Sequence, residues 1–316
     1  MRVLVTGANG FVGSQLVARL LGEGRLGNRE INTLTLVDTA FSTPPDDPRV
    51  HCVVGSIAEA EVLRGAVEGE PIDAVFHLAS VPGGTAEQDF DLARRVNLTA
   101  TEQLLEQLRL HASRPRFVFS STIAVYGAPM PAQVDDTTPP RPGMSYASQK
   151  LIGEILLEDY SRRGFVDGIA LRLPGIVARP SGGTGLLSGF MSDVFWHMKE
   201  GRKFVCPVSP DAVAWWMSVG CCVDYLILAA VLPVEATAAH RTLALPALRL
   251  TMADVVEGLV RRFGEDRRDL ISYRPNAQLE AQFGSFPTLK AEAAEALGFV
   301  HDGDVDRLVD QAVYVS

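Results

Sequence analysis

The sequence predicts an α/β fold built on a doubly wound parallel sheet, and two observations carry that prediction. Strand and helix patterns alternate along the first half of the chain, with apolar β-branched runs followed by segments of helical period. A glycine-rich turn joins the first strand to the first helix, which is how such sheets hold dinucleotides. The 316 residues, 47% of them hydrophobic, suffice for one or two domains.

The elements follow the order that winds such a sheet. Expected strands cover 2–6, 33–38, 50–54, 73–78, 116–121 and 168–173, and expected helices lie near 11–22, 58–67, 88–110 and 145–163. Breaker-rich sequence follows Arg172 and predicts a change of domain. We therefore expect a dinucleotide-binding domain at 1–175, with 219–240 packing back on it, and a smaller substrate-binding α/β part at 176–218 and 241–316.

Three glycines follow the first strand at intervals of three residues. Gly7 can make the turn, Gly10 can let the backbone approach a pyrophosphate, and Gly13 can let the helix pack closely. The N–H groups and the positive dipole end at the helix start suit phosphate groups. A purely structural turn is the alternative, but the strand-to-helix context favours a nucleotide site of the Rossmann type.

Asp38 ends the second expected strand. A carboxylate there can accept both ribose hydroxyls of adenosine and would repel a 2′-phosphate, which favours NAD over NADP. The alternative is an aspartate that caps the following loop, because its spacing from Gly13 is a little long.

Tyr146 and Lys150 stand four residues apart in a predicted helix. That spacing puts both side chains on one face, so the ammonium can favour the ionised phenol and make the tyrosine a catalytic base. A surface pair is the alternative reading. Half-ionising a tyrosine near pH 7 requires a pKa shift of about three units, and we expect a bound nicotinamide cation to supply part of it.

Composition argues against several other classes of protein. The net charge of −9 comes without a basic tract, so we expect no nucleic-acid partner. No apolar stretch approaches the length of a membrane span and the N-terminus lacks the pattern of a signal peptide, so we expect no membrane contact and a cytoplasmic location. Cys52, Cys206, Cys221 and Cys222 show no ligand spacing, so we expect reduced thiols and no metal.

Five ordered motifs resemble one known family. They are Thr6-Gly-Ala-Asn-Gly-Phe-Val-Gly13, His77-Leu-Ala79, Val96-Asn97, Phe119-Ser-Ser-Thr122-Ile-Ala-Val-Tyr126-Gly127, and Tyr146 with Lys150. Together they are similar to the extended short-chain dehydrogenase/reductases, the NAD-dependent epimerase/dehydratase family. The resemblance implies an NAD-dependent enzyme with a Rossmann domain, and it covers nearly the whole chain.

The resemblance also implies roles for individual residues. Thr122 orients the substrate hydroxyl, Tyr146 takes its proton, and Lys150 holds the nicotinamide ribose and eases ionisation of the tyrosine. His77 takes a structural place beside the cofactor. The implied cofactor-binding residues are Gly7, Asn9, Gly10, Phe11, Val12, Gly13, Asp38, Ser56, Ile57, Leu78, Ala79, Ser80, Asn97, Ser120, Tyr146, Lys150, Pro174 and Ile176.

Two departures bear on the substrate. The run Arg172-Leu-Pro-Gly175-Ile-Val-Ala-Arg179-Pro180 lacks the Asn and Tyr-Gly of the sugar-nucleotide members, and 214–224 departs from their late aspartate-rich signature. Four fragments bear on the branch of the family: His77-Leu-Ala-Ser-Val-Pro-Gly-Gly84, Ala86-Glu-Gln-Asp-Phe-Asp91, Arg172-Leu-Pro174 with Arg179-Pro180, and Cys206-Pro207. They are most similar to the D-erythronate dehydrogenase branch, which oxidises small sugar acids at C2. Such an acid needs a cation for its carboxylate, and Arg179 is the candidate, with a surface arginine as the alternative.

Several alternatives stay open. The leading hypothesis is oxidation of a D-erythronate-like aldonate, the second is a nucleotide-sugar epimerase or dehydratase, and the third is an NAD-sensing regulator without catalysis. The glycine-rich segment 181–185 is a flexible linker, a lid or an anion cradle. Relatives often pair through two long helices, so we expect a homodimer through 88–110 and 145–163.

Overall fold

The computed structural model describes residues 1–41, 43–180 and 187–313. The chain forms two compact units, each of which gathers separate stretches of sequence. The first contains Met1–Val125, Met144–Arg172 and Val223–Leu243, and the second contains Tyr126–Gly143, Leu173–Cys222 and Ala244–Ser316.

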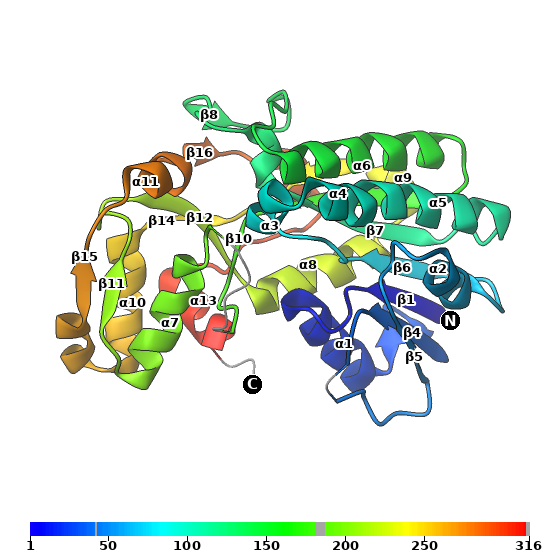
Figure 1. Cartoon of the computed structure of the whole chain (residues 1–316), viewed down its shortest axis with the longest axis horizontal. Helices are drawn as coiled ribbons and strands as arrows, with labels where there is room; N and C mark the ends of the chain where they lie inside the picture. The colour runs from blue at the N-terminus through cyan, green and yellow to red at the C-terminus, as the bar shows by residue number, and fades with distance from the viewer. Residues whose placement is uncertain (42, 181–186, 314–316) are drawn as a thin grey trace. The chain divides into compact units, whose positions relative to one another are not determined.

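A seven-stranded sheet in the order β13-β9-β7-β6-β1-β4-β5 forms the centre of the first unit (Figure 1). Its strands are β1 (Arg2–Thr6), β4 (Thr33–Asp38), β5 (Val50–Val54), β6 (Ala74–His77), β7 (Arg116–Thr122), β9 (Asp167–Leu173) and β13 (Thr242–Ala244). Parallel pairs join β1 to β4 and to β6, β4 to β5, and β6 to β7. The predicted α/β fold of the Rossmann type is confirmed, and the six expected strands lie within one residue of the predicted bounds.

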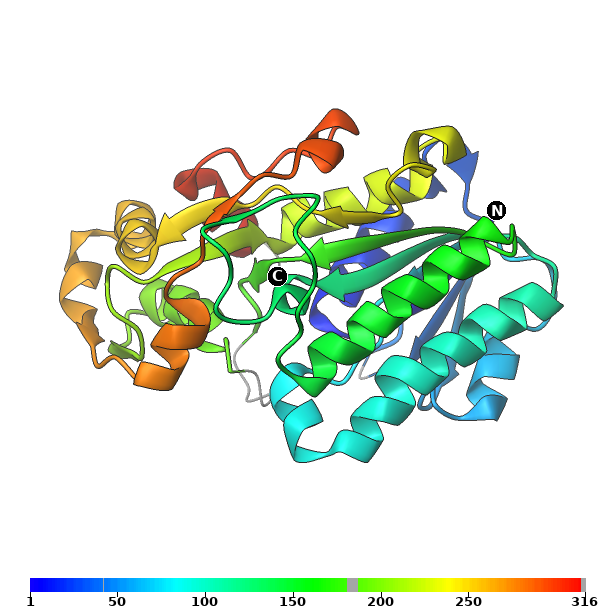
Figure 2. The ribbon, with the colours of Figure 1, turned by 90° about the horizontal axis from the view of Figure 1, so that it is seen from above.

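Helices cover both faces of this sheet (Figures 1 and 2). On one face, α2 (Ala60–Val67), α5 (Ala100–Leu110) and α6 (Ser145–Arg162) share an apolar cluster with the sheet. On the other, α1 (Phe11–Glu23) is tied to α8 (Val219–Val231) by an ion pair of 3.1 Å between Arg19 and Asp224. Strands covered on both faces explain the nearly continuous apolar runs in the sequence.

The expected helix near 88–110 is divided. It consists of α4 (Phe90–Ala93), the π-helix η1 (Arg94–Thr99) and α5, and a further short helix, α3 (Gly83–Gln88), precedes it. Asp89 separates α3 from α4, because its side chain accepts the N–H of Leu92 at 2.9 Å and caps α4.

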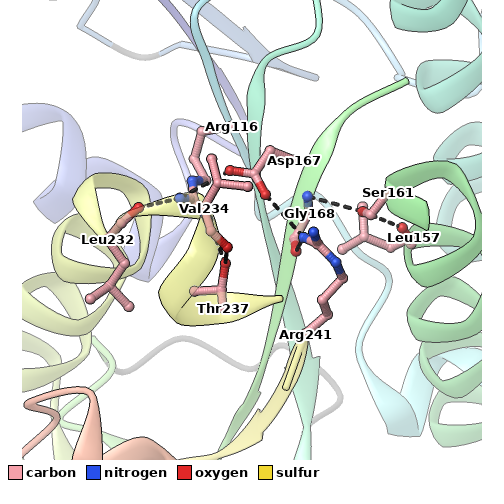
Figure 3. A network of polar contacts seen from close by, with 9 residues as sticks. All are labelled: Arg116, Leu157, Ser161, Asp167, Gly168, Leu232, Val234, Thr237 and Arg241. Atoms are coloured by element: carbon pink, nitrogen blue, oxygen red, sulfur yellow. Dashed lines mark hydrogen bonds and ion pairs between the residues drawn. The ribbon is translucent and has the colours of Figure 1, made fainter. Parts of the chain in front are cut away.

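A buried charge network lies where β7 and β9 begin (Figure 3). Asp167 Oδ2 lies 3.0 Å from the guanidinium of Arg116, and its Oδ1 lies 2.9 Å from that of Arg241. Arg116 also donates to the carbonyl of Leu232, close to the end of α8. The network therefore ties the amino ends of two central strands to the segment after α8.

The second unit contains a three-stranded sheet in the order β10-β12-β14. Strand β12 (Val213–Ser218) pairs in parallel with β10 (Gly175–Val177) and antiparallel with β14 (Leu248–Thr251). The sequence analysis missed β10 and β12. Trp215 and Trp216 on β12 are buried, and their indole N–H groups donate to the carbonyls of Pro287 and Leu250.

Shorter elements complete the two units. The other helices are α7 (Phe190–Glu200), α9 (Val234–Thr237), α10 (Met252–Phe263), α11 (Ala277–Phe283), α12 (Glu292–Ala296), α13 (Val305–Val313) and the 3₁₀ helices η2 (Ile123–Tyr126) and η3 (Glu265–Leu270). Two-residue or three-residue strands pair as β2 (Arg25–Leu26) with β3 (Arg29–Glu30), β8 (Gln133–Val134) with β16 (Thr288–Leu289), and β11 (Phe204–Cys206) with β15 (Ile271–Tyr273). None of the helices in the described ranges is both long and apolar enough to cross a membrane.

Candidate active site

The glycine turn between β1 and α1 is built so that neither Gly7 nor Gly13 can carry a side chain. Gly7 has a φ of +70°, and a Cβ atom there would lie 2.7 Å from the amide nitrogen of Ala79. A Cβ atom at Gly13 would lie 2.0 Å from the carbonyl oxygen of Gly7. The first turn of α1 therefore packs directly on the backbone of the loop, as a phosphate-holding turn requires.

The start of α1 presents main-chain groups. Gly10 is the N-cap and supplies no side-chain acceptor to the first turn of α1. The N–H of Asn9 points elsewhere and donates to Asp38 at 2.8 Å. This helix start fits the pyrophosphate of a dinucleotide.

Asp38 lies at the end of β4 and holds the glycine loop. One carboxylate oxygen accepts the N–H of Asn9, and the other accepts the N–H of Thr39 at 2.7 Å. The contact with Thr39 is the loop cap that the sequence analysis gave as an alternative. The Thr39 hydroxyl also donates to Asp38 Oδ1, at 3.3 Å. A carboxylate has about four acceptor positions, so these three bonds leave it able to accept from a ribose as well.

Two further loops leave the sheet on the same side, because they follow the carboxyl ends of parallel strands. Ser56 and Ile57 follow β5, whose neighbour Gly55 donates its N–H to the carbonyl of Asp38 at 2.9 Å. Leu78, Ala79 and Ser80 follow β6, and the N–H of Leu78 donates to the carbonyl of Thr6 at 3.1 Å. These predicted cofactor residues thus surround the glycine turn.

His77 is buried at the end of β6 and is neutral. Burial, with Lys150 as a second cause, lowers the pKa of His77 to about 3. Its Nδ1 lies 2.7 Å from the Thr6 hydroxyl and its Nε2 lies 2.9 Å from the Thr101 hydroxyl. Because Thr101 donates to the carbonyl of Asn97, Nε2 must carry the ring proton, and His77 has the structural role expected of it.

Asn97 links the loop after β6 to the helix that carries Tyr146. Its side-chain oxygen accepts the N–H of Val81 at 2.7 Å, and its amide nitrogen donates to the carbonyl of Val81 and to Gln149 Oε1 at 2.8 Å. Asn97 lies inside the π-helix, a distortion that often marks a functional site. The wider turn therefore coincides with a buried asparagine that holds the loop after β6 in place.

Three consecutive hydroxyl groups at the end of β7 have different partners. Ser120 donates to the carbonyl of His77 at 3.0 Å, and Ser121 donates to the carboxylate of Glu154. Thr122 instead accepts the N–H of Ala124 at 3.1 Å, so its hydroxyl proton is not used in that bond. These partners favour Thr122 as the donor to a substrate oxygen.

Tyr146 and Lys150 lie one turn apart near the start of α6. Lys150 Nζ lies 5.9 Å from the centroid of the Tyr146 ring, and the lysine side chain is 1% exposed. Burial lowers the pKa of Lys150 to about 7, while the nearby charge of Glu154 acts in the opposite direction. The ammonium is therefore close to its titration midpoint at neutral pH.

The sequence analysis missed Glu154, which lies one turn beyond Lys150. Its carboxylate accepts from Nε of Arg172 at 3.1 Å and from a second guanidinium nitrogen at 2.8 Å. Both side chains are largely buried, and Ser121 is the third member of the group. The i, i+4, i+8 spacing of Tyr146, Lys150 and Glu154 was the available signal.

Three predicted site residues belong to the second unit. Pro174 lies between β9 and β10, and Ile176 lies in β10 opposite Met217 of β12. The backbone of Arg179 is fixed by Ser192, which accepts its N–H at 3.0 Å, and by the indole of Trp196, which donates to its carbonyl at 2.5 Å. The segment 181–185 lies outside the described residues.

Comparisons with known proteins extend over the whole chain. Residues 3–236 match the model of the NAD dependent epimerase/dehydratase family. The D-erythronate dehydrogenase of Cupriavidus necator is 41% identical over 98% of this chain and 97% of its own, and that of Haemophilus influenzae is 34% identical over 99% of both. A crystal structure of a nucleoside-diphosphate-sugar epimerase from Agrobacterium tumefaciens has a TM-score of 0.93 and 34% identity, and covers 100% of this chain and 94% of its own.

Proposed function

Because the chain belongs to the NAD-dependent epimerase/dehydratase family and is an NAD-dependent dehydrogenase, we propose that it oxidises a small hydroxy acid. The substrate is a D-erythronate-like aldonate, which loses two electrons at C2 and becomes the 2-oxo acid. The likeness to two proteins named D-erythronate dehydrogenase, along nearly the full length of all three chains, supports this substrate. The observation that carries the chemistry is the buried Lys150 one turn after Tyr146.

The first unit supplies the groups that would hold NAD. The glycine turn and the first N–H groups of α1 would bind the pyrophosphate, and Asp38 would accept the adenosine ribose hydroxyls. Lys150 would contact the nicotinamide ribose. A bound NAD⁺ would supply the acceptor for the hydride from C2.

The proton and the hydride of the substrate go to different acceptors. The Thr122 hydroxyl donates a hydrogen bond to the substrate oxygen at C2 and orients it. Tyr146, as the phenolate, takes the proton of that hydroxyl while the C2–H bond breaks and the carbonyl forms. The ammonium of the buried Lys150, beside the Tyr146 ring, favours the phenolate over the phenol because opposite charges attract.

We propose Arg179 as the cation for the substrate carboxylate. Two bonds to its backbone, from Trp196 and to Ser192, fix the segment that carries this side chain. A guanidinium binds a carboxylate through two parallel hydrogen bonds. An Arg179→Gln variant should therefore raise KM for the acid about tenfold or more and change KM for NAD little; an unchanged KM for the acid would return Arg179 to the surface role.

A second candidate is a nucleotide-sugar epimerase or dehydratase. The likeness to a structure described as a nucleoside-diphosphate-sugar epimerase favours it. In that reaction Thr122, Tyr146 and Lys150 would oxidise the sugar only transiently, so no net NADH would form. The absence of the diphosphate-binding asparagine at Gly175 weighs against it.

The decisive experiment is a substrate panel. Four-carbon and five-carbon aldonates and common nucleotide sugars are incubated with NAD⁺, and NADH is followed by absorbance. We expect NADH from the aldonates and none from the sugars. Turnover confined to the nucleotide sugars would overturn the proposal, and a Tyr146→Phe protein that retained its full effect in cells would favour the non-catalytic regulator.

We also propose that the protein is a homodimer that pairs through α5 and α6. Ile152 and Ile155 on α6 are 41% and 59% exposed, and they lie three residues apart on the outer face of the helix. Pairing with a second copy would remove this apolar surface from water. Light scattering at micromolar concentration should show a dimer, and Ile155→Glu should shift it to a monomer; a monomeric unmodified protein would rule the dimer out.

A further inference from the structure

The ammonium of Lys150 is held in an unusually apolar place. The side chain is 1% exposed, so it loses nearly all the water that stabilises a charge. Lys150 Nζ lies 4.7 Å from the centroid of the Phe119 ring, within the range at which the negative face of an aromatic ring attracts a cation. Phe119 lies on β7, three residues before Thr122.

The packing around Phe119 fixes its ring against α6. A Cβ atom at Gly153 would lie 2.7 Å from Phe119 Cζ, so only glycine lets the ring approach the helix there. On β6, the His77 ring lies 5.7 Å away at an angle of 20° and stacks on Phe119. Because Phe119 is fully buried between such neighbours, its ring keeps its place beneath the lysine.

The charged and titratable groups around Lys150 stabilise its ammonium only in part, so the Phe119 ring can contribute to that stabilisation. On α6 they are Tyr146 and Glu154, on β6 the neutral His77, and on β9 Arg172. On α3, Glu87 accepts the N–H of Ser145 at the start of the helix. Glu154 shares its charge with Arg172 through two hydrogen bonds, so it is only a partial counter-ion for Lys150.

Building on the proposed function, we propose that Phe119 is a positioning residue for the reaction. The face of its ring holds the Lys150 ammonium in its charged form, with Glu154 as the supporting carboxylate. Phe119 acts on the substrate only through Lys150 and Tyr146. A less negative potential at the face of the ring should therefore favour neutral Lys150. The phenolate of Tyr146 would then lose part of its electrostatic stabilisation.

The test replaces Phe119 with phenylalanines that carry one, two or three ring fluorines. Each fluorine weakens the negative face of the ring and changes its volume little. The chain has four lysines, so selectively labelled lysine side chains give an NMR spectrum in which the titration of Lys150 can be followed directly. A Lys150→Met protein identifies the signal.

We expect the pKa of Lys150 to fall step by step along the series, by about one unit for three fluorines. The matched control is the same series at Phe117, which is buried on the same strand and also contacts the His77 ring, at 5.8 Å. There the pKa of Lys150 should stay within about 0.2 units. A flat series at position 119, or an equal fall at position 117, would overturn the proposal.

The rate of hydride transfer gives a second measurement. Along the Phe119 series, the acid limb of the pH–rate profile should move to higher pH while the plateau rate is kept, since a structural defect would lower the rate at every pH. An acid limb that stays in place while the pKa of Lys150 falls would also overturn the role. If no aldonate is turned over, the proposed function fails, but the NMR titration still decides whether Phe119 holds the ammonium.

Discussion

The two ends of strands β7 and β9 both carry buried polar side chains, but they use them differently. At the amino ends, Arg116, Asp167 and Arg241 satisfy one another and the carbonyl of Leu232 (Figure 3). At the carboxyl end of β7, the Thr122 hydroxyl accepts the N–H of Ala124 without using its own proton, and on the adjacent helix α6 burial lowers the pKa of Lys150 to about 7. Closed networks stabilise a fold, whereas groups left short of full satisfaction are available for chemistry.

The largest expected effect comes from removing the proposed base near the carboxyl end of β7. Tyr146→Phe removes the proposed base, so kcat for the acid should fall by about 10³-fold, within the range known for general bases. The melting temperature and NAD affinity, measured by calorimetry and fluorescence titration, should stay close to those of the unmodified protein. A variant that kept more than a tenth of kcat would remove Tyr146 from the mechanism.

A change in the network at the amino ends of β7 and β9 should lower stability and leave activity largely intact. Asp167→Asn leaves the buried Arg116 and the partly buried Arg241 with a neutral partner and should lower the free energy of unfolding by about 3 kcal/mol in urea titrations. Activity per folded molecule should change less than twofold. Asp159→Asn, which breaks an exposed pair with Arg162, is the matched control and should change stability little.

Substitutions at the neighbouring hydroxyl groups should have smaller effects, which differ between Thr122 and Ser120. Thr122→Val should lower kcat by about 10²-fold, as loss of one donor to a reacting oxygen does. Thr122→Ser should restore most of the rate. Ser120→Ala should leave kcat nearly unchanged and act on stability and on KM for NAD, because Ser120 donates to the carbonyl of His77 and is an implied cofactor-binding residue. Equal losses of kcat at both positions would contradict the distinct roles.

The smallest expected effect concerns the choice of cofactor. Asp38→Asn keeps an acceptor for the N–H of Asn9 but removes the charge that would repel a 2′-phosphate. The ratio of kcat/KM for NAD to that for NADP should fall roughly tenfold. An unchanged ratio would favour the loop-capping role of Asp38 alone.

The sequence predicted the parts of the molecule that depend on local pattern. The β1 turn and helix α1 followed from Gly7, Gly10 and Gly13, and their contacts explain why, since a side chain at Gly7 or Gly13 would strike the backbone. Family resemblance selected Thr122 among three hydroxyls, and its partners agree with that choice. Apolar runs covered by helices on both faces predicted the central strands well.

The parts that the sequence missed depend on distant partners. The π-helix at Arg94–Thr99 contains Asn97, whose amide is held by Val81 and Gln149, 16 and 52 residues away. The group of Glu154, Arg172 and Ser121 likewise joins one helix and two strands. No local periodicity encodes such contacts, so only the folded chain reveals them.

The absent side chain at Gly153 has a mechanical consequence. With no β-carbon there, the tip of the Phe119 ring reaches the backbone of α6, and this contact sets how closely the helix packs on β7. Tyr146 and Lys150 share that helix. A Gly153→Ala substitution would therefore displace both side chains together relative to Thr122 on the strand. The helix fixes the spacing between Tyr146 and Lys150, whereas their distance from Thr122 depends on how closely α6 packs on β7.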